Sequence, residues 1–432
     1  MPAAHRRNDR ETGAGWAGTA VRVATVPPEI RHPTVDEAAD FLRTVNTSYL
    51  EPESKDAGRA RFWLDHVRPD LDRTWGAFDR GRAVGTLRSL PFELTVSGGR
   101  TVPADGISMV SVAATHRRRG LLTGMIGTAL AAAAGRGDPV SILIASEWRI
   151  YGRYGFGPAT EAAEWKVDTF RAGAPSPVGE LEYVPAAELR PLAQPAYDRM
   201  RRQRAGGLDR PELRWDRDFG LVHAEGADPD WDGRAVVHRD PAGDVDGYLR
   251  YHSSWGPGTD NTLTVDELVA ATDGAYADLW RFALSVDLVT QVVARSRPVD
   301  EPLPWLLGDG RFAHQTDRYD KLWLRVLDVP AALTARDYLA PGRVVLEVVD
   351  KAGYAAGRFA LDAGPDGASC EPTTASADLT LPVTALGSAY LGGHRLGALA
   401  VAGLVDEHTP GALRTADRLL GTDRAPWSTL HF

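Results

Sequence analysis

A basic loop placed directly before an apolar helix is the feature that most constrains the fold of this 432-residue chain. The stretch reads THRRRGLLTGMIGTALAAAA from Thr115 to Ala134, and its apolar residues recur at the spacing of a buried helical face. The residues at that spacing are Leu121, Leu122, Met125, Ile126, Ala129 and Leu130. The first N–H groups of a helix have no acceptor within it, so the helix start is electropositive and disfavours cations. Arg117, Arg118 and Arg119 break this rule, which predicts an anion bound at the start of the helix.

The segments on either side of this helix favour a phosphate-binding unit. Ile107 to Val112 is strand-like, and Val140 to Ala145 has the composition of a buried strand after the helix. A strand, a basic turn and then a helix is a layout in which backbone N–H groups cradle a phosphate or pyrophosphate. Arginine is abundant in this chain, since only four of the 49 basic residues are lysine, so a solvated cationic loop is the alternative interpretation.

Length and composition limit the class of protein. A chain of 432 residues exceeds a comfortable single core, so two or three domains are expected. The apolar content of 43% is that of an ordinary soluble globular protein. The longest apolar run, within residues 121–134, is shorter than the roughly 20 residues that a membrane span needs. Residues 1–20 have no hydrophobic core region, which argues against a secretory signal and predicts a disordered tail on a cytoplasmic protein.

Charge and motif content exclude several classes of partner. The formal net charge of −9 argues against nucleic acid as the main partner and mildly favours cationic ones. The single cysteine, Cys370, rules out an intramolecular disulfide and a cysteine-rich metal site. The eleven histidines are scattered without ligand spacing, so no metal is expected. The GAGWAG stretch at residues 13–18 matches a dinucleotide-binding motif but follows no strand, and we reject it.

The order of strand, Arg/Gln-x-x-Gly-type loop, helix, strand and Tyr-x-x-x-Gly-Phe resembles the core of the GCN5-related N-acetyltransferases (GNATs). The segments SVAATHRRRGLL and ASEWRIYGRYGFGPAT resemble one subfamily, the enhanced-intracellular-survival (Eis) acetyltransferases. This resemblance implies acetyl-CoA as the acyl donor, with its pyrophosphate on the loop and its pantetheine arm along the preceding strand. The donor-site residues that it implies are Val110, Ser111, Val112, Arg118, Arg119, Gly120, Leu121, Leu122, Thr123, Ser146 and Glu147. It also implies that Tyr151 protonates the leaving thiolate, in preference to Tyr154, which lies too close to Gly155.

The remainder of the chain has the patterns of further αβ domains. Strand-like GYLRYH and VTQVVARS flank a helical segment within residues 166–322, but no second phosphate loop occurs there. The alternating segments RVVLEVVD and GRFALDA, followed by an ADLTLP strand and a helix, lie within residues 323–432. The resemblance therefore implies a mixed α/β (α+β) chain with a catalytic GNAT domain at 21–165 and a degenerate GNAT-like domain at 166–322. A sterol-carrier-protein-like domain at 323–432 completes the chain that begins with the tail at 1–20.

The chain ends in DRAPWSTLHF, an apolar sequence for a terminus. Most C-termini are solvated and frayed, and a frayed tail has little reason to carry Trp427, Leu430 and Phe432. The Eis resemblance implies that the terminal aromatic residue is buried in the active site, where its α-carboxylate is the general base. A free α-carboxyl has a pKa near ~3.5, and burial raises its basicity. His431 stands where family members can carry an acidic residue, so we expect weaker preference for the most cationic amines and test His431 as the alternative base.

The activity that the resemblance implies is N-acetylation of primary amines by direct transfer in a ternary complex. The acceptor is expected to be a small molecule, such as an aminoglycoside or polyamine, or the lysine side chain of a peptide. The expected assembly is a homohexamer, with no metal, no nucleic acid and no membrane span. Trp63 and Met109 are candidate walls of the acceptor pocket, with core packing as the other interpretation. Two alternatives remain, a lipid-binding or transfer protein that uses the sterol-carrier-like domain, and a catalytically inactive regulatory relative.

Overall fold

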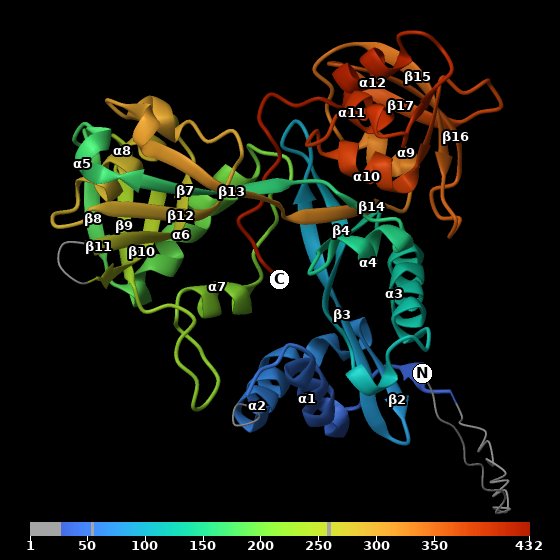
Figure 1. Cartoon of the computed structure of the whole chain (residues 1–432), viewed down its shortest axis with the longest axis horizontal. Helices are drawn as coiled ribbons and strands as arrows, with labels where there is room; N and C mark the ends of the chain where they lie inside the picture. Colours follow the sequence, from blue (N-terminus) through green and yellow to red (C-terminus); the bar gives the residue numbers. More distant parts are fainter. Residues whose placement is uncertain (1–26, 53–55, 257–260) are drawn as a thin grey trace, which may run out of the picture.

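The computed structural model describes residues 27–52, 56–256 and 261–432. The tail predicted at residues 1–20 and the rejected motif at 13–18 lie outside these ranges. The described residues form two sheets of seven strands and one of five, each with helices packed beside it (Figure 1).

The first sheet contains the predicted phosphate-binding unit. Its strand order is β1-β2-β3-β4-β5-β14-β6. The strands are β1 (Glu29–Arg31), β2 (Thr74–Asp79), β3 (Arg82–Thr95), β4 (Thr101–Val112), β5 (Val140–Ile144), β14 (Leu322–Val326) and β6 (Gly157–Pro158). The helices of this part are α1 (Ala38–Ser48), α2 (Asp56–Val67), α3 (Leu121–Arg136) and α4 (Trp148–Tyr151). Strands β4 and β5 are parallel, and α3 supplies the crossover that a parallel pair requires.

The second sheet repeats this arrangement of a parallel pair joined by a helix. Its strand order is β13-β7-β12-β11-β10-β9-β8. The strands are β13 (Ala313–Asp320), β7 (Glu161–Asp168), β12 (Gln291–Arg297), β11 (Asn261–Ala270), β10 (Val245–Trp255), β9 (Arg234–Arg239) and β8 (Glu180–Val184). The helices are α5 (Thr169–Ala172), α6 (Ala186–Arg201), α7 (Glu212–Asp218) and α8 (Asp273–Ser285). Strands β11 and β12 are parallel with α8 between them, as β4, α3 and β5 are in the first sheet.

The third sheet is smaller and lies in the last hundred residues. Its strand order is β17-β16-β15-β18-β19. The strands are β15 (Gly342–Val349), β16 (Gly357–Gly364), β17 (Gly367–Pro372), β18 (Leu379–Pro382) and β19 (Asp406–Glu407). The helices are α9 (Val329–Thr334), α10 (Val383–Tyr390), α11 (Leu396–Val401) and α12 (Ala412–Leu420).

The chain crosses between the first two sheets twice. It leaves the first sheet for β7, and after β13 it returns as β14, which lies between β5 and β6. Leu322 pairs with Ile144 and Val326 with Val140, so β14 is antiparallel to β5. The expected domain boundary at 165/166 falls within β7, and the one at 322/323 falls within β14. All of β7 pairs within the second sheet and all of β14 within the first, so neither strand is divided at the expected boundary.

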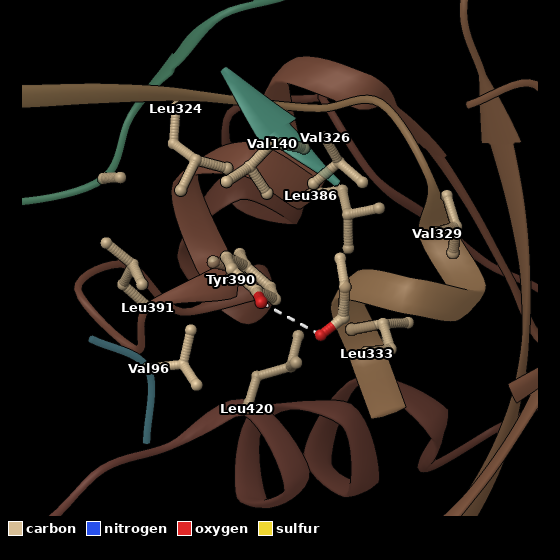
Figure 2. Packing of buried hydrophobic residues seen from close by; sticks show 14 of the residues in the cluster. Val96, Val140, Leu324, Val326, Val329, Leu333, Leu386, Tyr390, Leu391 and Leu420 are labelled. Carbon is tan, nitrogen blue, oxygen red and sulfur yellow. Dashed lines mark hydrogen bonds between the residues drawn. The ribbon is translucent and has the colours of Figure 1, made fainter. Parts of the chain in front are cut away.

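The first sheet and the third domain share one hydrophobic core (Figure 2). Val140 of β5 and Leu324 of β14 pack with Leu333 of α9, Tyr390 of α10 and Leu420 of α12, and all five side chains are buried. Burial of an apolar side chain of this size stabilises a fold by roughly 1.5–3 kcal/mol. The shared core therefore holds the third domain against the sheet that carries the basic loop.

Helix α3 buries the face that its sequence predicts. Leu121, Met125, Ile126, Ala129 and Leu130 are buried, while Leu122 is half-buried. The helix begins after Gly120 and ends at Gly137, and both glycines adopt the left-handed conformation that favours glycine. The start of α3 is thereby fixed at the end of the basic loop.

Candidate active site

Strands β4 and β5 separate before β4 reaches the basic loop. They pair only from Ala104 with Val140 to Ile107 with Leu143, whereas β4 continues to Val112. A bulge in β4 contributes to the separation, because the register against β3 shifts next to Met109, whose φ is 51°. Thr86 of β3 stabilises the bulge by donating its hydroxyl to the Met109 carbonyl over 2.8 Å. Backbone groups of β4 beyond Ile107 therefore face an opening instead of β5.

A cavity of about 630 Å³ occupies this opening. The predicted donor-site residues that line it are Val110, Ser111, Val112, Arg118, Gly120, Leu121, Leu122, Thr123, Ser146 and Glu147. Tyr151 lines it as well, so the structure brings the predicted general acid and most of the predicted donor site together. Arg117 of the basic loop and Tyr154, the alternative general acid, also line the cavity. The lining residues that the sequence did not single out are Ser48, Tyr49, His116, Ile150 and Arg153.

The three arginines of the basic loop differ in their position relative to the cavity. Arg117 and Arg118 line the cavity, and Arg118 has a φ of 63° that turns the chain into Gly120. Arg119 is exposed, and its guanidinium donates to the Thr115 carbonyl over 3.3 Å. The first turn of α3 contains no acidic residue. The predicted anion site thus combines free helix N–H groups with the guanidinium groups of Arg117 and Arg118.

Arg153 is a further arginine that lines the cavity. It follows Tyr151 in the turn Gly152–Tyr154, and its Nε donates to the Ile150 carbonyl over 3.3 Å. The sequence indicated Arg153 through its position in IYGRYGFG, two residues after Tyr151. Glu147 is the one carboxylate among the described residues that line the cavity. The lining is therefore predominantly cationic, which suits a phosphorylated ligand.

Tyr151 ends helix α4 and is 5% exposed. Burial is the main cause that raises the pKa of its hydroxyl to about 12, and nearby Tyr49 acts in the same direction. Its ring packs edge-on against Phe156, with the ring centroids 6.5 Å apart. A phenol with this pKa keeps its proton at neutral pH, so it can serve as a proton donor but not as a base. Tyr154 is less enclosed, and its hydroxyl lies 3.1 Å from the Thr123 hydroxyl.

The turn after Tyr151 is held by Arg325, a residue that sequence reasoning missed. Gly155 has a φ of 85°, and a Cβ atom on it would lie 1.5 Å from the Arg325 Nη1 atom. That Nη1 donates to the Tyr154 carbonyl, and Nη2 pairs with Asp350 at 2.8 Å. Arg325 lies on β14 and Asp350 follows β15, so the second crossover strand and the third domain both support this turn. A lone arginine in the apolar strand LWLRVL was the available signal.

The C-terminal segment runs between the first two sheets and ends on the first (Figure 1). Trp427 is buried and donates its indole N–H to the Ser296 carbonyl of β12 over 2.7 Å. Leu430 is buried too, and the Phe432 ring lies 4.7 Å from the Phe92 ring of β3. Phe432 does not line the donor cavity, but it packs on the same sheet beside Gly106 of β4. The chain end therefore approaches β4 upstream of the cavity-lining residues.

The two candidate acceptor walls lie in a packing cluster. Trp63 is buried and stacks on Phe41 with the ring centroids 5.7 Å apart, and Met109 packs beside them. The structure thus provides a core-packing role for Trp63. Met109 is half-buried and belongs to the β4 bulge that opens the cavity.

Comparison with known proteins agrees with this geometry. Family models described as acetyltransferase (GNAT) domains match residues 29–159 and 206–326, and a sterol carrier protein domain matches residues 329–429. N-acetyltransferase Eis of Mycobacterium tuberculosis is 38% identical over 388 residues, which are 87% of this chain and 92% of that protein. The crystal structure of Eis1 from Mycobacterium abscessus matches with a TM-score of 0.82 and 34% identity, covering 94% of this chain and 100% of that one. The chain belongs to the Eis family of N-acetyltransferases.

A further relative supports the assignment as an N-acetyltransferase. An uncharacterized N-acetyltransferase of Streptomyces avermitilis is 43% identical over 401 residues, which are 90% of this chain and 95% of that protein. The predicted fold class of two GNAT domains followed by a sterol-carrier-like domain is confirmed, and so is the prediction of an N-acetyltransferase.

Within the described ranges, no helix has the length and apolar content to cross a membrane. The same ranges contain no group of three or more His, Cys, Asp or Glu side chains that could hold a metal ion.

Proposed function

We propose that this enzyme transfers the acetyl group of acetyl-CoA directly to a primary amine within a ternary complex. The observation that carries the proposal is the cavity at the β4–β5 separation, where the start of α3, Arg118 and buried Tyr151 face the same space. GNAT enzymes use acetyl-CoA as their donor, and a cationic cavity of about 630 Å³ suits a long phosphorylated molecule.

The donor would lie along β4 with its pyrophosphate at the helix start. Backbone groups of Val110 to Val112 would bind the pantetheine arm, since β5 does not pair with them. The α3 N–H groups and Arg118 would bind the pyrophosphate, with Arg117 and Arg153 available from the cavity wall. A hydrogen bond to a charged group is worth roughly 1.5–3 kcal/mol, so a few such contacts account for tight binding of the donor.

The chemistry removes protons from the amine nitrogen and adds one to the leaving sulfur. A primary amine has a pKa near ~10.4 and must lose a proton to solvent before its lone pair attacks the thioester carbonyl. The nitrogen of the resulting tetrahedral intermediate loses a second proton as the bond from carbon to sulfur breaks. The leaving thiolate takes the proton of the Tyr151 hydroxyl, and solvent then reprotonates Tyr151. The α-carboxylate of Phe432 would accept the second proton of the nitrogen, and the position of Phe432 beside Gly106 on β4 supports this role.

The acceptor is proposed to be an aminoglycoside, a polyamine or a lysine side chain, and the enzyme a cytoplasmic homohexamer, on the basis of the Eis resemblance. A role in lipid transfer receives no comparable support. Tyr338, Leu386 and Tyr390 fill the interior of the sterol-carrier-like domain and are buried (Figure 2 shows the latter two). A transfer protein of this class would need an apolar tunnel in the same place.

The test is acetyl transfer by the purified full chain, measured as CoA release with a thiol reagent. Aminoglycosides, polyamines and lysine peptides would be compared, and mass spectrometry would identify the acetylated product. Amine-dependent CoA release supports the proposal. Acetyl-CoA binding without any amine-dependent release, or co-purification of a stoichiometric lipid without CoA binding, would refute it.

A further inference from the structure

The second GNAT domain repeats the strand separation that forms the donor cavity in the first. Strands β11 and β12 pair from Thr262 with Gln291 to Val265 with Ala294, and β11 then continues to Ala270. The register of β11 against β10 shifts directly after Val265, and β4 has such a shift against β3 beyond its last pair with β5. The second sheet therefore opens at the place in the fold where the first sheet holds the proposed donor site.

An arginine of the second domain fills this opening. Arg297, the last residue of β12, is 4% exposed, and its Nη1 atom donates to the Leu268 carbonyl over 2.8 Å. Leu268 follows the last paired residue of β11 by three positions, as Val110 follows that of β4. Val110 is one of the residues whose backbone we expect to bind the pantetheine arm. The corresponding position of the second domain is thus already occupied by a side chain.

The start of α8 also differs from the start of α3. The Thr272 hydroxyl accepts the Ala275 N–H over 3.1 Å, and Asp273 adds a negative charge to the first turn. The start of α3 has neither a side-chain cap nor an acidic residue. A negative charge at a helix start is stabilised by the helix dipole, so Asp273 takes the place that a phosphate group would take.

A cavity of about 310 Å³ remains beside the filled opening. Six charged side chains of the described residues line it, and each of them pairs with another of the six. The pairs are Arg204 with Asp300 at 2.8 Å, Arg297 with Glu301 at 3.2 Å and Arg424 with Asp273 at 3.4 Å. This part of the chain therefore offers a phosphorylated cofactor no unpaired charge at the cavity.

The C-terminal segment binds at the edge of this cavity. Trp427 lines it, and the Arg297 Cζ atom lies 5.1 Å from the centroid of the Trp427 rings. The Trp427 N–H donates to the Ala205 carbonyl over 2.8 Å. The Ala425 N–H donates to Asp300 Oδ2 over 2.8 Å. The second domain thus holds the segment a few residues before the chain end, which packs on the first sheet.

We propose that the second domain positions the C-terminal segment, with Arg297 and Asp300 as the positioning residues and with Arg297 in place of a cofactor. Neither residue lines the donor cavity, so both act on the reaction through the chain end at Phe432. The effect on catalysis rests on the proposed function, in which Phe432 supplies the base. A second acetyl-CoA bound in this domain is the competing interpretation, and the filled opening and the capped α8 disfavour it.

Release of Phe432 by a carboxypeptidase, followed by mass spectrometry of the intact full chain, tests this positioning without requiring turnover. The first variant is Trp427→Ala, which removes the ring beside Arg297 and the indole N–H. The second is Asp300→Ala, which removes the acceptor of the Ala425 N–H. Trp427→Phe keeps an aromatic ring beside Arg297 but no indole N–H.

Two residues of the same domain offer matched controls. Trp231 is 8% exposed, and the centroid of its rings lies 5.1 Å from the Arg250 Cζ atom. Its indole N–H donates to Asp266 over 3.0 Å. Glu182 forms an ion pair with Arg239 at 2.7 Å. Trp231→Ala and Glu182→Ala therefore remove similar contacts from the second domain and leave those of the C-terminal segment in place.

We expect Trp427→Ala and Asp300→Ala to release Phe432 about tenfold or more faster than the wild type, because each loses contacts that hold the chain end. The two controls should release it at the wild-type rate, and Trp427→Phe at an intermediate rate. Trp427→Ala and Asp300→Ala should also lower kcat about tenfold or more, since a displaced chain end misplaces the proposed base. Calorimetry should find unchanged acetyl-CoA affinity in both and one acetyl-CoA per chain.

Release of Phe432 from the wild type as fast as from both variants overturns the inference. Equally fast release from Trp231→Ala overturns it as well, and so does binding of two acetyl-CoA molecules per chain. Fast release from Trp427→Ala and Asp300→Ala with full kcat supports the positioning and refutes the carboxylate of Phe432 as the base. Fast release from these variants, with no amine-dependent CoA release even by the wild type, supports the positioning and refutes the proposed function.

Discussion

The buried pair between Arg325 and Asp350 predicts separate effects on stability and on activity. The two side chains are 1% and 2% exposed and lie 2.8 Å apart. Arg325→Met leaves the Asp350 carboxylate buried without its cation, and breaking a buried pair in this way costs about 3–5 kcal/mol of unfolding free energy. Asp350 still accepts the Ala352 and Ala355 N–H groups, over 3.1 and 3.0 Å, so the loss should lie at the lower end of that range.

The double variant Arg325→Met/Asp350→Asn separates the two effects. Asparagine keeps an oxygen for the two N–H groups but carries no charge, so most of the lost stability should return. Activity should not return, because Arg325 also donates to the Tyr154 carbonyl and packs against Gly155 in the turn after Tyr151. A displaced turn misplaces the Tyr151 proton, and a misplacement of about 1 Å can lower the rate 10²-fold.

Urea unfolding would give the stability of each variant, and CoA release under saturating acetyl-CoA would give kcat. We expect both variants to lose about 10-fold to 100-fold in kcat, although only the single variant is strongly destabilised. Recovery of kcat together with stability in the double variant would show that the pair acts only on folding. A loss below about 1 kcal/mol in Arg325→Met would contradict its burial.

Three further predictions follow from the donor cavity and the chain end. Arg118→Ala should weaken acetyl-CoA binding about tenfold, as measured by calorimetry. Arg119→Ala should change the affinity little, since Arg119 donates to the Thr115 carbonyl and does not line the cavity. Equal losses of affinity in the two variants would contradict the geometry. Tyr151→Phe should lower kcat by roughly 10²–10⁴-fold with little change in donor affinity, and Tyr154→Phe should lower it less. Because the pKa of Tyr151 is about 12, its hydroxyl stays protonated up to about pH 10, and the wild-type kcat should not fall between about pH 8 and pH 10. Residues appended after Phe432 should abolish transfer while acetyl-CoA still binds, and wild-type turnover with such a tag would exclude the carboxylate as base.

The donor side of the site was predictable because its parts are close together in the sequence. The strand ending at Val112, the loop at Arg118 and the turn at Tyr151 follow one another with one helix between them, and periodicity with glycine spacing locates each of them. The same reasoning could not predict which arginines of the basic loop line the cavity. Arg118 and Arg119 differ in their roles because the positive φ of Arg118 turns the chain, and neither composition nor spacing specifies that angle.

The contacts between distant segments of the chain were less predictable. The Arg325 guanidinium reaches the Tyr154 carbonyl across 171 positions of sequence, and the Trp427 indole reaches the Ser296 carbonyl across 131. An apolar ending indicated that the chain end is buried, but it did not indicate which sheet the end packs on. The sheets to which β7 and β14 belong were also not predictable. Strand β14 is mostly apolar and β7 mixes apolar with charged residues, but neither pattern specifies the strand with which it pairs.

The return of the chain to the first sheet as β14 has a mechanical consequence for the proposed reaction. Arg325 lies near the end of the short crossover strand β14 and holds the turn after Tyr151. Strand β14 is hydrogen-bonded to β5 on one side and to β6 on the other, so it cannot shift without moving the ends of both strands. The turn that carries the proposed proton donor is thus supported from β14. Any change that loosens β14 in the shared core, such as truncation of Leu324, should therefore lower kcat while acetyl-CoA binding changes little, as calorimetry and CoA release would measure.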